Sequence, residues 1–173
     1  MSILAGYIVP HPPLAVHEVG RGDEEAIRAT LDSYAKVAED VARLRPDTII
    51  ITSPHTVMYS DYFHISPGTA AYGDLGSFRA PQVTFDVKYD TELVSEIGHR
   101  CFLQDFPAGI EGERDKTLDH GVMVPLYFID KAYRDYKLVR IGLSGLSLEA
   151  HRNLGQIIKA SVDSLRSEER RVG

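Results

Sequence analysis

Short apolar runs alternate along the chain with longer stretches in which apolar residues recur every three or four positions. Runs rich in β-branched residues predict buried strands, and the longer spacing predicts amphipathic helices. We expect strands over residues 2–9, 48–52, 62–66, 82–88 and 137–143, and helices over residues 23–44, 91–103, 121–133 and 148–165. The pattern therefore predicts an α/β protein.

The first strand, the long helix and the second strand have the lengths of a βαβ unit. Acidic residues at positions 23–25 open the helix, where its dipole favours negative charge, and Pro46 follows its end. The two strands of such a unit run parallel, so their carboxyl ends lie at the same edge of the sheet. We expect a single α/β/α domain over residues 1–173, with a central mixed, largely parallel sheet.

Two segments between the later elements are expected to be loops. Residues 67–81 contain several glycines and prolines, and they predict a surface loop of the kind that often forms a lid over a ligand. Residues 107–116 are polar and charged, and they lead to His120. Pro125 fits the following helix only in its first turn, where a missing N–H removes no hydrogen bond.

Three histidines follow apolar runs at places where the chain turns. His11 lies between prolines, His55 follows a predicted strand, and His120 lies between Asp119 and Gly121. Parallel strands would bring His11 and His55 to one sheet edge, where α/β folds place their ligands. Two neutral imidazoles there suit a divalent transition metal, either with a carboxylate as in non-haem Fe(II) oxygenases or as in zinc hydrolases. Alternatively, these rings only cap backbone groups.

His120 has the neighbours of a proton-transfer group. The adjacent Asp119 and the following glycine suggest a ring that titrates near neutral pH, although Asp119 would also cap a helix that starts there. His17 lies close enough to His11 in the sequence to reach the same site. Ser53 lies beside His55, but no Gly-x-Ser-x-Gly motif supports a nucleophile there.

Composition narrows the functional classes. The chain has 173 residues and a net charge of -6, which argues against nucleic acid or an anionic membrane as its partner. The single cysteine, Cys101, excludes an internal disulfide and is expected to be a buried, inert thiol. No signal-peptide pattern and no run long enough to span a bilayer is present, so we expect a cytoplasmic protein.

Three ordered motifs resemble those of the class III (LigB-type) extradiol ring-cleaving dioxygenases. They are His11-Pro12-Pro13, Ser53-Pro54-His55 and Leu118-Asp119-His120-Gly121, the last followed by Val124-Pro125-Leu126. The resemblance implies Fe(II) held by His11 and His55, a catechol-type substrate with dioxygen, and acid/base catalysis by His120 beside Asp119. Pro12, His17, Ser53 and Gly121 are then expected near the substrate.

The resemblance also implies residues that this sequence does not contain. The family's third ligand is a glutamate in a C-terminal segment, after a strand that would begin near Val172, so we expect the chain to be truncated. The sheet edge left open would favour a homo-oligomer. Residues 13–22 look closest to LigB-like proteins linked to Memo and to AMMECR1-type domains, which makes an AMMECR1-type domain a candidate partner. The alternatives are a Memo-like binding or redox protein without ring cleavage, and a zinc-dependent hydrolase.

Overall fold

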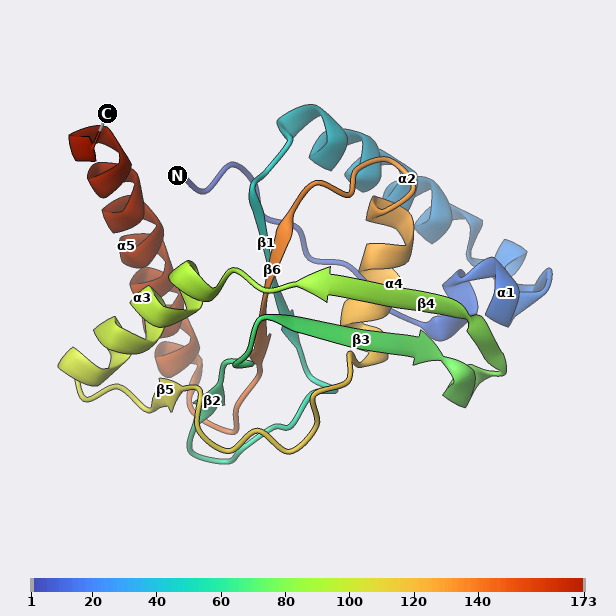
Figure 1. Cartoon of the computed structure of the whole chain (residues 1–173). Helices are drawn as coiled ribbons and strands as arrows, with labels where there is room; N and C mark the ends of the chain where they lie inside the picture. The colour runs from blue at the N-terminus through green and yellow to red at the C-terminus, as the bar shows by residue number, and fades with distance from the viewer. Residues whose placement is uncertain (1, 173) are drawn as a thin grey trace.

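Two parallel strands, β1 (Thr48–Ser53) and β6 (Lys137–Gly142), form the centre of the computed structural model (Figure 1). Two helices cover each face of this pair. They are α2 (Arg28–Leu44) and α4 (His120–Ile129) on one face, and α3 (Thr91–Leu103) and α5 (Leu148–Val172) on the other. The structure describes residues 2–172, and the side chains of residues 2–165. The α/β class and the layered order of helices and strands are confirmed.

The other strands form two further pairs beside β6. β2 (Phe63–His64) pairs in parallel with β5 (Ala108–Gly109), and β3 (Ala70–Leu75) forms an antiparallel hairpin with β4 (Ala80–Lys88). Single bridges at Leu138 and Ile141 connect these pairs to β6. The mixed character of the sheet is therefore confirmed, but in the described residues the strands form three short pairs rather than one continuous sheet.

Two hydrophobic clusters lie on the two faces of β6. The first lies between the central strands, α4 and the β3–β4 hairpin, and includes Leu138. The second lies between β6, α3 and α5, and includes Val139 and Ile141. Alternate strand residues point to opposite faces, so Arg140 points toward the same side as Leu138. No helix in the described chain is long and apolar enough to cross a lipid bilayer.

The expected strand over residues 2–9 is not formed. In the described chain, β1 pairs only with β6, and no backbone hydrogen bond joins residues 2–9 to it. The segment instead lies along an apolar cavity of about 600 Å³ beside β1 and α2, and it leaves Ile3, Leu4 and Ile8 exposed. An apolar run becomes a strand only where a neighbouring strand accepts its hydrogen bonds, and none does here. The predicted βαβ unit was therefore wrong.

Two further expectations are corrected around the hairpin and the first long helix. The segment 67–81, expected as a loop, contains β3 and a 3₁₀ turn at Gly76–Phe78. The helix expected from residue 23 begins as the 3₁₀ helix Asp23–Ile27 and continues as α2. Before it lie a 3₁₀ turn at Pro13–Ala15 and the short helix α1 (His17–Gly20).

Pro125 was expected in the first turn of its helix but is the sixth residue of α4. It has no N–H, so it cannot donate the helical hydrogen bond to the carbonyl of Gly121. Pro125 and the neighbouring Val124 and Leu126 are all buried in the core, and burial of their apolar surface favours this helix despite the missing hydrogen bond. Ser147 caps α5 as expected, because its Oγ accepts a hydrogen bond from the N–H of Ala150 at 3.2 Å.

Candidate metal centre

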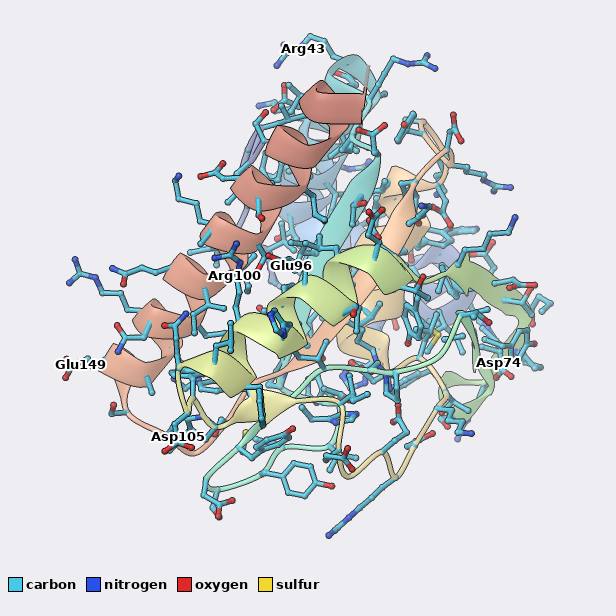
Figure 2. All side chains as sticks on the ribbon, turned by 60° about the vertical axis from the view of Figure 1, so that its left-hand side comes forward. Arg43, Asp74, Glu96, Arg100, Asp105 and Glu149 are labelled. Atoms are coloured by element: carbon cyan, nitrogen blue, oxygen red, sulfur yellow. The ribbon has the colours of Figure 1, made fainter. Side chains whose placement is uncertain are left out.

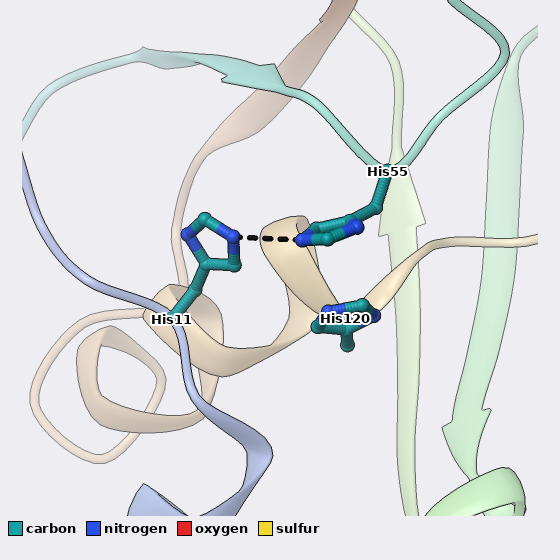
Figure 3. Close-up of side chains that lie close together, drawn as sticks. All are labelled: His11, His55 and His120. Atoms are coloured by element: carbon teal, nitrogen blue, oxygen red, sulfur yellow. Dashed lines mark hydrogen bonds between the residues drawn. The ribbon is translucent and has the colours of Figure 1, made fainter.

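The rings of His11, His55 and His120 converge on one point (Figure 3). The Nε2 atoms of His11 and His55 are 2.9 Å apart, and the ring centroids of His55 and His120 are 3.9 Å apart. One nitrogen from each of the three rings lies within 4.8 Å of the other two. Residues that the sequence separates widely are therefore neighbours in space, although the first strand predicted to bring them together is absent.

Each ring is held by a different part of the fold. His11 follows Pro10, whose carbonyl accepts a hydrogen bond from the hydroxyl of Tyr34 on α2. Pro12 follows it, and the carbonyl of Pro12 accepts a hydrogen bond from the N–H of Ala15 at 2.9 Å in the 3₁₀ turn. These contacts, together with the fixed φ of proline, restrain the segment that carries His11.

His55 and His120 are connected through Ser53 and Asp119. The Ser53 hydroxyl donates to Asp119 Oδ1 at 2.5 Å and accepts the backbone N–H of His55 at 3.1 Å. Asp119 is the N-cap of α4, and the same Oδ1 accepts the N–H of Gly121 at 2.9 Å. One carboxylate oxygen therefore fixes both the turn after β1 and the start of the helix on which His120 is the first residue.

Gly121 is required by the close approach of these elements. A Cβ atom at this position would overlap Ser53 Oγ and would lie 2.9 Å from Asp119 Oδ1 and 3.2 Å from Cδ2 of His55. Only glycine allows the first turn of α4 to approach the turn after β1 so closely.

The environment of His120 favours its neutral form. Burial lowers the pKa of the His120 ring below its ordinary value, the neighbouring His55 lowers it further, and the charge of Asp119 partly opposes both. A neutral imidazole can coordinate a metal ion or accept a proton. Phe78 contributes to this burial, because its ring packs edge-on against His120 at a centroid distance of 5.2 Å. No sequence motif marked Phe78, which lies in the segment expected to be a loop.

The spacing of the nitrogens fits a transition metal. Two nitrogens that each bind a metal at about 2.1 Å, at right angles, lie about 3.0 Å apart, close to the 2.9 Å between His11 and His55. Without a metal the same spacing is that of an N–H···N hydrogen bond. In the described part of the chain, this histidine trio is the one cluster of metal-ligating side chains, and no carboxylate belongs to it.

One of the residues expected near the substrate, His17, has a partner elsewhere. The side chain of His17 contacts Glu24, with which it forms a close ion pair, and most of its surface is exposed.

The apolar cavity beside β1 adjoins the metal centre, because His11 and Gly121 are among its lining residues. Most of the rest of its lining is apolar and comes from the N-terminal segment, α2 and β1.

Comparison with known proteins places the chain in a family. A protein of Clostridium acetobutylicum named CA_C1420 is 38% identical to it, over 95% of this chain and 37% of the relative. The chain thus spans little more than a third of the length of that relative. The family model for LigB, the catalytic subunit of aromatic ring-opening dioxygenase, matches residues 5–172. Because this match covers nearly the whole sequence, the chain belongs to the LigB family.

Proposed function

We propose that this chain is an Fe(II)-dependent extradiol dioxygenase-type domain that cleaves a catechol-like ring with dioxygen. The observation that carries the proposal is the convergence of three imidazoles, from three separate segments, in a chain of the LigB family. His11 and His55 would hold the metal, since their Nε2 atoms have the spacing of adjacent ligands. Bound iron would supply open coordination positions and the redox chemistry that dioxygen requires.

His120 would move the protons. Its lowered pKa leaves the ring neutral near pH 7, so a ring nitrogen can accept the proton of a substrate hydroxyl and return it later. Its place beside His55 brings that nitrogen next to the metal position. Asp119 would act by fixing the start of α4 and by stabilising the protonated ring, because its charge raises the pKa of His120.

The apolar cavity would receive the uncharged part of the substrate. It includes Gly121 and His11, and an apolar, concave surface beside a few polar groups is typical of a small-molecule site. Pro12 and Ser53 would shape the site indirectly, through the turn after His11 and through the Ser53–Asp119 hydrogen bond.

Several finer proposals rest on the family resemblance alone. They are the third ligand, a glutamate outside these 173 residues, a Memo-like branch and an AMMECR1-type partner. The greater length of the relative leaves room for further segments in proteins of this kind. Iron loading of a version extended by the corresponding segment of the relative, compared with this chain, tests the third ligand.

Oxygen uptake by the anaerobically iron-loaded protein tests the proposal. We expect uptake with at least one member of a panel of catechols, and none for His11→Ala or His55→Ala. His120→Ala should keep its iron and lose about 100-fold or more in kcat, the usual size of an acid/base contribution. His99→Ala, on the exposed side of α3, is the matched control. If the fully iron-loaded protein takes up no oxygen, or takes up oxygen equally without a catechol, ring cleavage is rejected. Either result would favour a Memo-like binding or redox role.

The donor set supports a second candidate. Three histidines with no carboxylate are the ligands of one class of zinc hydratases and hydrolases, in which a fourth position holds water. A zinc-dependent hydrolase would cleave model esters only when loaded with zinc, and His55→Ala would abolish the activity. The iron-loaded and zinc-loaded proteins, assayed side by side, separate the two candidates.

A further inference from the structure

The loop of residues 110–118 brings the chain to Asp119 and His120. It follows β5, forms no regular secondary structure, and is mostly exposed. Its first part is held by a hydrogen bond of 2.5 Å from the hydroxyl of Tyr59 to the carbonyl of Gly112. Whatever holds the last residues of this loop determines where α4 begins, and therefore where the His120 ring lies.

A buried arginine holds those last residues. Arg140 lies in the middle of β6 and is 1% exposed. Its Nη1 donates to the carbonyl of Thr117, and its Nη2 donates to the carbonyl of Asp115 at 2.8 Å. Its Nε donates to Ser66 Oγ at 2.6 Å. All three guanidinium nitrogens are therefore engaged, two of them with backbone just before Asp119.

The charge of Arg140 is balanced inside the protein. Oε1 of Glu113, in the same loop, is 3.5 Å from Nη2 of Arg140 and 3.5 Å from Nε2 of His64. Nδ1 of His64, whose side chain is fully buried, lies 3.0 Å from the carbonyl of Glu111. The loop is thus tied to β2 and β6, by hydrogen bonds at Glu111, Asp115 and Thr117 and by the longer ion pairs of Glu113.

Core stability alone does not account for this arginine. Its neighbours on β6, Val139 and Ile141, are apolar and fully buried. Burying a guanidinium costs several kcal/mol in desolvation, and apolar residues of similar volume often replace such ion pairs without loss of stability. What an apolar residue cannot do is bind two backbone carbonyls at once with a rigid, planar group. The arginine therefore specifies the conformation of the loop.

We propose that Arg140 is a positioning residue for His120. By holding the carbonyls of Asp115 and Thr117, it fixes the path of the loop into Asp119, so that α4 starts with the His120 ring beside His55. The consequence for turnover rests on the proposed function, whereas the consequence for the loop does not. Neither His11 nor His55 lies on this loop, and His55 is linked to it only through Ser53 and Asp119, so metal binding at those two rings should be affected much less than the position of His120.

The substitution Arg140→Lys tests this role, because it keeps the buried charge and removes the planar fork. In the metal-free protein, amide hydrogen exchange of residues 115–121 should become about tenfold faster, since a hydrogen bond to a charged group is lost, while exchange in α3 and α5 stays unchanged. In the iron-loaded protein, kcat should fall by about 100-fold, with KM and iron content nearly unchanged, because a displaced catalytic group slows turnover without weakening substrate binding.

Arg100→Lys is the matched control. Arg100 and Glu96 form an ordinary ion pair of 2.6 Å along α3, where Figure 2 labels both side chains. This variant should leave loop exchange and kcat unchanged. If Arg140→Lys does not fold, Ser66→Ala, which removes one partner of the guanidinium, should show the same two effects at smaller size.

Unchanged exchange in residues 115–121 in the folded Arg140→Lys or Ser66→Ala protein overturns the proposal. So does faster exchange throughout the chain together with loss of iron, which would indicate a general role in stability. If the wild-type protein shows no oxygen uptake, the proposed function fails, and the exchange measurement on the metal-free protein still decides the role of Arg140.

Discussion

At the candidate metal centre, single side-chain atoms hold more than one segment of the chain in place. Ser53 is fully buried, and its hydroxyl contacts both Asp119 and the backbone of His55. The three histidines, Asp119 and Gly121 could be found from the sequence, because each lies in a turn beside an apolar run. Phe78 and Arg140 could not, since each acts through a contact with a segment far away in the sequence.

Gly121→Ala should destabilise the protein and weaken metal binding. The added methyl group would overlap Ser53 Oγ and crowd His55, and overpacking of this kind costs about 1–3 kcal/mol. Thermal unfolding and metal titration measure the two effects. Gly155→Ala on α5 is the control, because its methyl group meets open space and a helix gains up to about 1 kcal/mol from alanine. Equal stability of the two variants would show that the centre is loosely packed.

At the level of elements, the turn between β3 and β4 packs Phe78 against the ring of His120, the first residue of α4. The pattern of apolar residues predicted α3 with its observed bounds and the position of α2, because helical periodicity is a local property. It missed the hairpin strand β3, in which exposed and buried residues alternate over Ala70–Leu75. The glycines and prolines in and around that strand favour a loop, and they obscure the short alternation.

The hairpin should set the pH dependence of catalysis. Burial is the largest cause of the lowered pKa of His120, so the neutral base should be lost only as the pH falls below its ordinary value of about 6.5. Phe78→Ala admits water and raises that pKa, so the acid limb of kcat/KM should move to higher pH. Tyr72→Ala, exposed on the same hairpin, should leave the limb in place. If Phe78→Ala leaves the acid limb of the kcat/KM profile at the same pH, the group that titrates there is not His120.

The whole molecule has an open edge beside β1. In the described chain this strand pairs only on one side, and the N-terminal segment leaves apolar side chains exposed next to it. The α/β class and its layers followed from the order of elements. The absence of a strand over residues 2–9 could not be predicted in this way. A strand needs a neighbouring strand to pair with, and a local pattern of apolar residues does not specify that neighbour.

This edge should make the protein self-associate. Light scattering after size-exclusion chromatography should give a mass above the 19.2 kDa of one chain, rising with concentration. Ile8→Lys, which places a charge on the exposed segment beside the edge, should lower that mass. Phe102→Lys on α3 is the control, as another highly exposed apolar residue away from this edge. A monomer at every concentration would show that the open edge is protected.

The central claim is that His11 and His55 form one metal centre, and equilibrium Fe(II) binding under anaerobic conditions tests it most directly. We predict one iron per wild-type chain, binding weakened by about 100-fold or more in both His11→Ala and His55→Ala, because each removes one of the ligands, and no change in His99→Ala. Wild-type affinity in either of the first two variants would contradict the account.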